Sequence, residues 1–415
     1  MRRFSKSSPN RLSADSQKLA ALAQGSAQSA SRLEERHWEH GLDSVLQRLL
    51  KNDHQDTIDA TLEHLFRTDL TAYDALMEAV EACSESCRID HDGVLHDVLL
   101  IAIPILAWTR FTIASGPIPE DTRAALIAQL HGHLLADNAK LALAPTLYSI
   151  DQLPRSHVET YALTQRMAQA AVKGSVPRQP VNSPETAPFL ADTRYLIAAV
   201  ATPAGSPLFR WQASMNPAER MHALSAWRKQ AGPNLSSLLP GCGVELLMPE
   251  AYYIACREAD KLIRPASIRA AVHFLTNSLS VDPSGLRAII GGFSEDPVSG
   301  RVDEYRVGFT LRQMPEVVYG VVWPLYGQED EEESAVISLE SVMAPETVAE
   351  ELRTPIEEIV ALLRACGVTH IKRHNERFPM EFCDDCGAPL YPDQDGELVH
   401  AEMPEDVPSN TGHFH

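Results

Sequence analysis

The sequence lacks an apolar run long enough to span a membrane. The most apolar stretch, Val98 to Trp108, is about half of the roughly 20 residues that a spanning helix needs, and Pro104 interrupts it. We interpret this stretch as a buried helix. The chain opens with Met-Arg-Arg, but no apolar run of signal-peptide length follows. We therefore expect no membrane segment and no export by the signal-peptide route.

Cysteine and positive charge are also scarce. The seven cysteines are an odd number without the spacing of a disulfide framework, which favours a reducing cytoplasm over a secreted scaffold. The 36 basic residues are outnumbered by 56 acidic ones, and the formal net charge is -20 at pH 7. Such a charge repels phosphate backbones and anionic lipid. We therefore expect a cytoplasmic protein whose bulk surface does not bind nucleic acid.

The common catalytic motifs are missing from the sequence as well. It contains no glycine-rich phosphate loop, Gly-x-Ser-x-Gly elbow, His-Glu-x-x-His helix or Walker pattern. The leading hypothesis is therefore a non-enzymatic binding or regulatory protein with an unknown protein partner. One alternative is an enzyme that acts on a small anionic substrate. The other is an RNA- or ribosome-associated protein that uses the basic residues Arg2, Arg3, Lys6, Arg11, Lys372 and Arg373.

What the sequence does contain is enough apolar material for more than one core. Its hydrophobic share is 44% and its charged share 22%, as in typical globular proteins, and 415 residues indicate two or three packed units. We predict an α+β multidomain fold. A mobile tail is expected at 1–12, an irregular α-helical domain at 13–173 and a linker at 174–188. A mixed or antiparallel sheet with helices is expected at 189–378, and a small zinc-ribbon-like module at 379–415.

Apolar periodicity and turn residues supply these boundaries. In the first domain, apolar residues recur at intervals of three and four, for example at Leu42, Val45, Leu46 and Leu49, as in amphipathic helices. The four prolines within 174–188 predict the linker. Short apolar runs then predict strands at 195–201, 244–248, 286–293, 304–311, 317–325 and 369–372. Turns at 296–300 and 313–316 separate the third, fourth and fifth of these strands, so we expect neighbours among them to pair antiparallel. Helices are predicted at 217–230, 249–264, 265–279 and 345–366.

The strongest local signal for chemistry is the sequence Cys383-Asp-Asp-Cys-Gly387. Cys-x-x-Cys-Gly forms a tight knuckle that directs two thiolates to one point, where they can take two corners of a tetrahedral zinc site. A turn at 392–396 and a short strand after it fold His400 back towards the cysteines. We predict a structural zinc site formed by Cys383, Cys386, His400 and His413.

Other ligand sets and other roles for these residues are also consistent with the sequence. His415, His370 and His374 compete with His413 for the fourth ligand position. The cysteine pair could instead be inert or redox-active. A second metal set, Cys83 and Cys87 on one helix face with His91 and His96 beyond, is weaker, because buried helix cysteines are far commoner than ligands.

Aromatic and basic residues are concentrated on the predicted helix pair 249–279. Arginine forks match the geometry of carboxylate and phosphate, so Tyr252, Tyr253, Arg257 and Arg269 could line an anion-binding cleft. Ion pairing within the helix, such as Arg257 with Asp260, is the simpler explanation of the charges.

Several stretches together resemble an uncharacterised proteobacterial family of unknown function. They are 103–111, 207–211, 244–269, 383–391 and 400–402. The resemblance spans nearly the whole chain. It implies a bacterial cytoplasmic protein, and it carries over no reaction and no catalytic residue.

Overall fold

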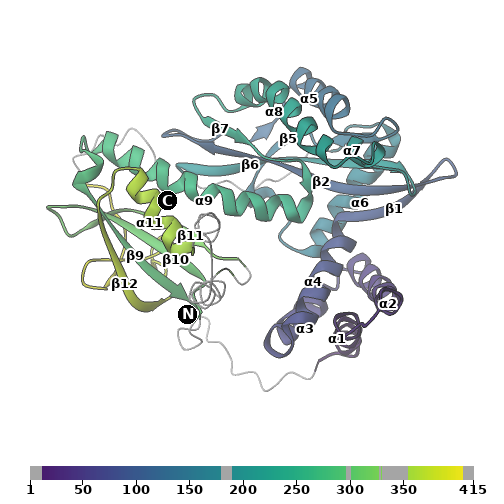
Figure 1. Cartoon of the computed structure of the whole chain (residues 1–415), viewed down its shortest axis with the longest axis horizontal. Coiled ribbons are helices and arrows are strands. Elements are labelled where there is room, and N and C mark those ends of the chain that lie inside the picture. Colours follow the sequence, from purple (N-terminus) through teal and green to yellow (C-terminus); the bar gives the residue numbers. More distant parts are fainter. Residues whose placement is uncertain (1–11, 179–188, 296–300, 327–328, 330–353, 405–415) are drawn as a thin grey trace.

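The computed structural model describes residues 12–178, 189–295, 301–326, 329 and 354–404. Four helices come first in the chain, and Figure 1 shows them as a separate layer. They are α1 (Ala14–Ala27), α2 (Arg32–Lys51), α3 (Gln55–Thr68) and α4 (Leu70–Glu85). The side chains of Ser13, Ser31 and Asp69 cap three of them by accepting backbone N–H groups. The predicted apolar stripe that includes Leu42 and Leu49 is buried between them, as expected.

A larger, wholly antiparallel sheet of eight strands follows in the described part of the chain. Its central pair, β2 (Val94–Trp108) and β6 (Ala191–Pro203), is in register from His96 opposite Pro203 to Trp108 opposite Ala191. The order is β1-β2-β6-β5-β3, with β4 also on β6, and β7 and β8 also on β2. The remaining strands are β1 (Ser86–His91), β3 (Gly116–Pro117), β4 (Lys140–Leu143), β5 (Thr146–Ser149), β7 (Gly243–Leu246) and β8 (Glu250–Ala251).

The interpretation of Val98 to Trp108 as a buried helix is wrong, because these residues form most of β2. Both faces of β2 are covered, so its sequence is a continuous apolar run without the alternation that marks a half-exposed strand. Pro104 is tolerated because its carbonyl accepts the Leu247 N–H at 3.0 Å on the side of β7 and β8. The Pro104 nitrogen, which carries no hydrogen, therefore faces the gap between those two short strands, where no ladder hydrogen bond is lost.

The prediction that 13–173 is helical throughout is wrong, because this segment also contributes strands to the larger sheet. Residues 86–91, 94–108, 116–117, 140–143 and 146–149 are strands, while α5 (Glu120–His133) and α6 (His157–Lys173) are helices as expected. The described part of the predicted linker begins at Gly174, which ends α6 in a left-handed conformation with φ 62°. Strands from before and after 174–188 pair with each other, so this segment connects elements of one sheet.

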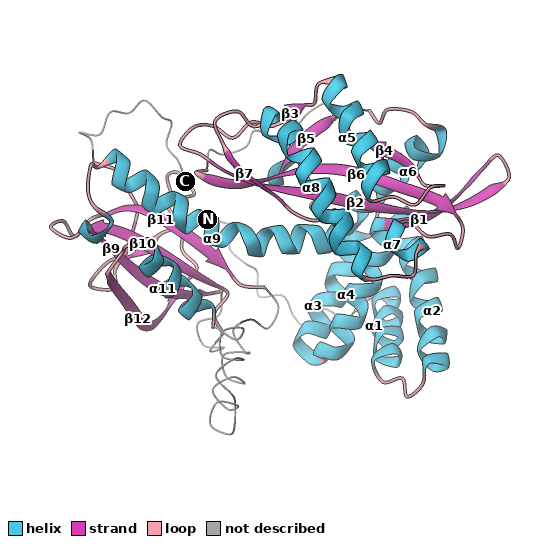
Figure 2. Cartoon of the chain, turned by 45° about the horizontal axis from the view of Figure 1, so that its top comes forward, coloured by secondary structure: helices cyan, strands magenta, loops and turns pink. Residues whose placement is uncertain are grey.

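Helices cover both faces of the larger sheet (Figure 2). Alternate residues of β2, such as Leu100 and Ala102, pack with α6 and the first half of α9 (Tyr252–Ser278). The residues between them, such as Ile101 and Ile103, pack with α5 and α8 (Ala218–Leu238). The short α7 (Arg210–Ala213) leads into α8. Because successive side chains of a strand point to opposite faces of the sheet, β2 contributes to two separate hydrophobic cores.

A smaller sheet of four strands follows, in the order β11-β10-β9-β12. The predicted strands are confirmed as β9 (Leu286–Ser294), β10 (Glu304–Leu311) and β11 (Val317–Pro324), all antiparallel, with β12 (His370–Pro379) parallel to β9. One face, which includes Val307 and Phe309, packs against the second half of α9 and α11 (Pro355–Ala365). Of the predicted helix 345–366, residues 345–353 lie outside the described residues.

One helix connects the two sheets. Two helices meeting at Pro265 were predicted, but α9 runs continuously through this proline. A proline inside a helix removes the donor for the carbonyl four residues earlier. That carbonyl, of Lys261, accepts Arg264 Nε at 3.2 Å instead. The side chain before the proline thus replaces the missing backbone donor, and α9 extends from one sheet to the other (Figure 2).

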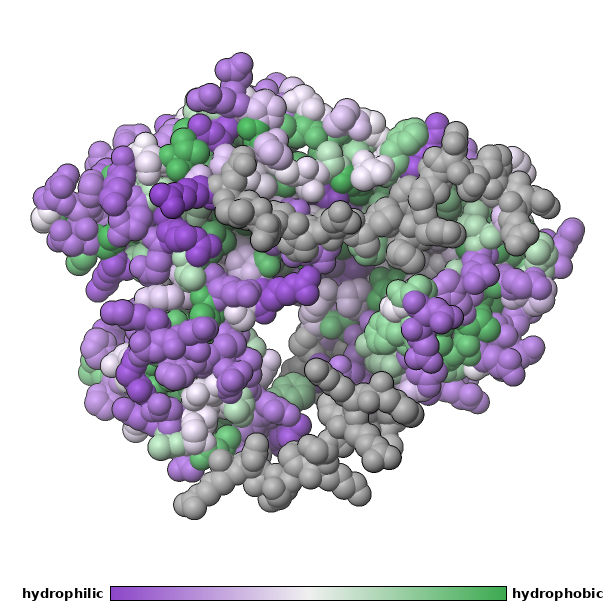
Figure 3. All heavy atoms as spheres, turned by 180° about the vertical axis from the view of Figure 1, so that it is seen from behind, coloured by the Kyte–Doolittle hydropathy of each residue, from purple (hydrophilic) through white to green (hydrophobic). Residues whose placement is uncertain are grey.

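One face of the molecule is mainly polar where described residues form it. In the view of Figure 3, hydrophilic side chains cover most of this face, and apolar side chains appear as small separate areas between them. Among the helices of the described residues, none combines the length and the apolar character that a bilayer crossing requires.

Candidate metal centre

The knuckle at 383–387 is held by two backbone hydrogen bonds. The Cys383 N–H donates to the Ala388 carbonyl at 2.7 Å, and the Gly387 N–H donates to the Cys383 carbonyl at 2.8 Å. Gly387 has φ 74°, a left-handed conformation that side chains other than glycine rarely adopt. The turn therefore depends on this glycine, and both thiols belong to one tight loop.

A hairpin brings the histidine to the knuckle. The strands β13 (Tyr391–Pro392) and β14 (Leu398–Val399) pair antiparallel. In the turn between them, Asp393 Oδ1 accepts the N–H groups of Asp395 at 2.8 Å and Glu397 at 2.9 Å. His400 follows β14 directly, so the closed turn determines which residue reaches the cysteines.

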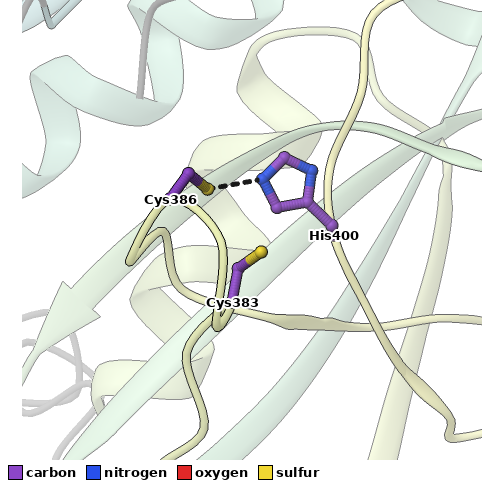
Figure 4. A group of neighbouring side chains, drawn as sticks. All are labelled: Cys383, Cys386 and His400. Atoms are coloured by element: carbon purple, nitrogen blue, oxygen red, sulfur yellow. Dashed lines mark hydrogen bonds between the residues drawn. The ribbon is translucent and has the colours of Figure 1, made fainter.

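The side chains of Cys383, Cys386 and His400 converge, as predicted (Figure 4). One ligand atom from each lies within 4.8 Å of the other two, and Cys386 Sγ is 3.2 Å from His400 Nε2. Around a tetrahedral zinc ion, with bonds of about 2.0 to 2.3 Å, such ligand atoms are roughly 3.5 to 3.8 Å apart. The three side chains therefore fit a metal ion after small movements.

Local groups favour the forms that bind metal. The backbone N–H groups of Cys386 and Asp385 hold the pKa of the Cys383 thiol below its ordinary value, which favours the thiolate. The Glu402 carboxylate lies 3.3 Å from His400 Nδ1, although the two are not aligned as a hydrogen bond. A carboxylate next to the non-ligating ring nitrogen commonly orients a metal-binding histidine.

The hairpin packs against the smaller sheet at two glycines. Gly308 and Gly320 are paired on β10 and β11, on the face opposite α9. A Cβ at Gly320 would overlap the Tyr391 ring, and one at Gly308 would lie 3.2 Å from the Pro392 carbonyl oxygen. The absence of side chains at these two positions lets β13 lie directly on the sheet.

Arg306 ties the knuckle to the same face. Its side chain is fully buried, and Nη1 donates to the carbonyls of Glu381 and Leu390, both at 2.7 Å. These two residues flank the knuckle on either side. Nε donates to Glu304 at 2.5 Å, and the guanidinium lies 4.2 Å from the Phe293 ring centroid. Sequence reasoning missed Arg306, and its only signal was a charged residue within an apolar strand.

The other proposed ligands either lie outside the described residues or are not part of the group. His413 and His415 lie outside the described residues. His370 and His374 are on β12, and neither belongs to the cluster of Cys383, Cys386 and His400. His374 Nε2 is 2.8 Å from the Asp393 carbonyl oxygen, so this ring contacts the hairpin turn instead.

The second set of residues considered as metal ligands is not brought together. Cys83 is buried in α4 and lies 3.4 Å from Asp43, whereas Cys87 is in β1. The helix face that the two were expected to share does not exist, because the chain changes from helix to strand at Ser86. His91 and His96 lie on β1 and β2 and complete no ligand group among the described residues.

The four residues of the predicted anion cleft do not meet. Tyr252 is buried, and the Tyr253 N–H donates to Glu85 Oε2 at 2.9 Å. Arg257 pairs with Glu81 of α4 at 2.5 Å, and not with Asp260. Arg269 lies 12 residues beyond Arg257 on the same helix, or roughly 18 Å at 1.5 Å per residue. These side chains therefore cannot line one site.

The basic residues of the RNA hypothesis are largely outside the described structure. Arg2, Arg3, Lys6 and Arg11 precede the first described residue. Lys372 and Arg373 are on β12, at one edge of the smaller sheet, where Lys372 Nζ donates to the Gln394 carbonyl.

Glu85, the partner of the Tyr253 N–H, gives the fold a pH dependence. Burial raises its pKa from 4.5 to about 7. Because the folded pKa is above the unfolded one, protons favour folding, and stability is lost as the pH rises from about 4.5 through about 7. Glu85→Gln removes this loss and keeps an acceptor, so it should stabilise the protein at pH 8 by up to roughly 3 kcal/mol.

Urea denaturation at pH 5 and pH 8 checks this prediction. The gain from Glu85→Gln should be several times smaller at pH 5. Glu78→Gln, at an exposed position on the same helix, is the matched control and should change stability little at either pH. An equal gain from Glu85→Gln at both pH values would contradict the raised pKa.

Comparison with known proteins gives a family and no function. Neither the curated proteins nor the solved structures contain a match to this chain. A family model described as "Protein of unknown function (DUF2863)" matches residues 4–414. Since the match covers nearly the whole chain, the protein belongs to this family of unknown function.

Proposed function

We propose that Cys383, Cys386 and His400 bind a structural zinc ion, with His413 as the fourth ligand. The observation that carries this proposal is the convergence of two thiols and an imidazole nitrogen within 4.8 Å. This mixture of soft sulfur and imidazole ligands suits zinc, whereas calcium and magnesium prefer oxygen. Four protein ligands close the coordination sphere, so the ion would stabilise structure and would not activate a substrate.

A metal ion at this site would stabilise a module that is too small to fold on its own apolar core. The described part of the module consists of the knuckle and one short hairpin, with Tyr391 as its buried apolar anchor on the sheet. So small a unit buries little apolar surface of its own, and a bound metal commonly supplies the missing folding free energy.

Metal analysis with a histidine series tests the proposal. The purified chain is expected to contain one zinc ion, and His413→Ala should weaken zinc binding by at least about tenfold, since it removes one of four ligands. His415→Ala and His370→Ala are matched controls that should bind zinc normally. A chain that is metal-free without chelator treatment would refute the site. Normal binding by His413→Ala would refute the fourth ligand alone.

For the whole chain we propose a cytoplasmic binding or regulatory role, in which the N-terminal helical layer contacts a partner protein. What supports this role is exposed apolar surface on that layer. Leu33, near the start of α2, is 78% exposed, and Leu70, at the start of α4, is 43% exposed. Neither leucine belongs to the core of the layer, so both are available to a partner, and apolar surface left exposed in this way can form part of a binding patch.

Affinity purification with charged variants tests this role. The wild-type chain should retain a partner that Leu33→Glu/Leu70→Glu loses. The control variant Met215→Glu/Met221→Glu, whose methionines are 89% and 62% exposed near α7 and α8, should retain it. Equal capture by all three chains, together with turnover of a metabolite by the purified protein, would refute the role.

A further inference from the structure

A cleft of about 870 Å³ lies between the larger sheet and the second half of α9. One wall is the end of β2 with the loop after it, from Leu106 to Phe111, together with Gly241 and Glu245 at β7. The other wall is α9 between Leu262 and Ser278. Figure 2 shows β7 and this part of α9 facing each other. The volume falls within the range of about 300 to 1,000 Å³ that is usual for small-molecule sites.

The sheet-side wall is fixed by specific contacts. Thr109 Oγ1 donates to the Gly241 carbonyl at 2.9 Å and accepts the Phe111 N–H at 3.2 Å. The Thr109 N–H donates to the Leu190 carbonyl at 2.9 Å. The Trp108 indole lies against Gly243, where any Cβ would overlap the ring. The loop and the indole are therefore positioned before any ligand arrives.

Two arginines reach this cleft from different walls. Arg110 is on the loop after β2, with its guanidinium 5.2 Å from the Phe111 ring centroid, and Arg269 is on α9. Neither guanidinium has a hydrogen bond or an ion pair with any residue that the structure describes. Both side chains are exposed, so their guanidinium groups are accessible to a ligand, whereas the buried Arg194, Arg264 and Arg306 are all paired within the fold.

The remaining polar and aromatic residues restrict the ligand. His273 lies one turn beyond Arg269, and Glu245 is the one acidic residue among the described residues that line the cleft. Trp108 and Phe274 offer flat apolar surface. Guanidinium pairs match carboxylate and phosphate groups, and aromatic rings stack on planar molecules.

We propose that this cleft binds a small organic anion with a flat aromatic body. Its carboxylate or phosphate lies between Arg110 and Arg269, and its ring lies against Trp108 and Phe274. Glu245 accepts a hydrogen bond from a donor group of the ligand. The site is separate from the cysteine cluster, so it goes beyond the proposed function and can fail independently of it.

Titration with a fluorescent aromatic sulfonate, 8-anilinonaphthalene-1-sulfonate, tests the proposal on the full chain. One molecule should bind, and Arg110→Met or Arg269→Met should weaken binding by about tenfold, because each removes a charge-assisted contact. Arg228→Met, at an exposed position of α8, is the matched control and should bind normally. The uncharged analogue N-phenyl-1-naphthylamine should bind the wild-type and the arginine variants equally.

Two further arms identify the anion and the ring contact. Displacement of the sulfonate by adenosine 5′-monophosphate would assign a phosphate ligand, and displacement by indole-3-acetate would assign a carboxylate. Gly243→Ala should weaken the binding of both fluorescent probes, because the added methyl group would displace the Trp108 indole. Equal sulfonate affinity in wild-type, Arg110→Met and Arg269→Met chains, or displacement by neither competitor, would overturn the proposal.

Discussion

Replacing Cys383 and Cys386 together by serine should release the metal and free the knuckle and hairpin from the smaller sheet. Serine hydroxyls keep the volume but are poor zinc ligands, so the free energy of metal binding no longer supports this module. We expect a loss of at least roughly 3 kcal/mol, a modest part of what structural zinc contributes in small domains. The larger sheet, which shares no residue with the module, should keep its stability.

Hydrogen–deuterium exchange can resolve this difference along the chain. The Cys383 and Leu390 amides, which donate to Ala388 and Glu381, should exchange faster in the double variant. The amides of the β2–β6 ladder should stay protected. Chelating zinc from the wild-type chain should have the same effect, and a chelator should not change the double variant further.

Other cysteines provide the control for this experiment. Cys242 and Cys366 are partly exposed and lie outside the ligand group, so Cys242→Ser/Cys366→Ser should keep both the metal and the exchange pattern. The same exchange and metal content in wild-type and Cys383→Ser/Cys386→Ser chains would contradict a structural metal.

The parts of the fold that sequence predicted well are those with local boundaries. The sequence between the strands β9, β10 and β11 contains proline or glycine, and the predicted ranges match within a residue or two. β2 was missed because both its faces are buried, which removes the alternation. α9 was divided in two because the sequence does not show that Arg264 replaces the donor that Pro265 lacks.

In the candidate site, too, the residues set by local sequence were predicted and the long-range contacts were not. Cys383 and Cys386 come from a short motif, and His400 follows from the turn before it, so spacing was sufficient. Arg257 and Glu81 are 176 residues apart, and no local pattern indicates that α9 lies beside α4. The contacts of Arg306 with the knuckle and of Gly320 with the hairpin are also long-range, so the surface that holds these two elements could not be predicted.

Arg306→Met should destabilise the smaller sheet by roughly 3 to 5 kcal/mol. Methionine fills most of the volume but leaves Glu304 without its buried partner, the Leu390 carbonyl without its Arg306 donor, and the Glu381 carbonyl with the Leu390 N–H alone. Arg306→Lys should be intermediate, because an ammonium group keeps the charge but cannot reproduce the planar fork. Chemical denaturation measures both changes.

Zinc affinity separates a docking role of Arg306 from a merely structural one. Arg306 contacts no ligand side chain, but it holds the backbone on both sides of Cys383 and Cys386. Arg306→Met should therefore weaken zinc binding by about tenfold or more even under conditions where the chain is folded, as loss of an outer-shell partner does in other metal sites. Arg312→Met, at an exposed position just after β10, should bind zinc as the wild-type does. If Arg306→Met lost stability but kept wild-type zinc affinity, the knuckle would fold around its ion without support from the sheet.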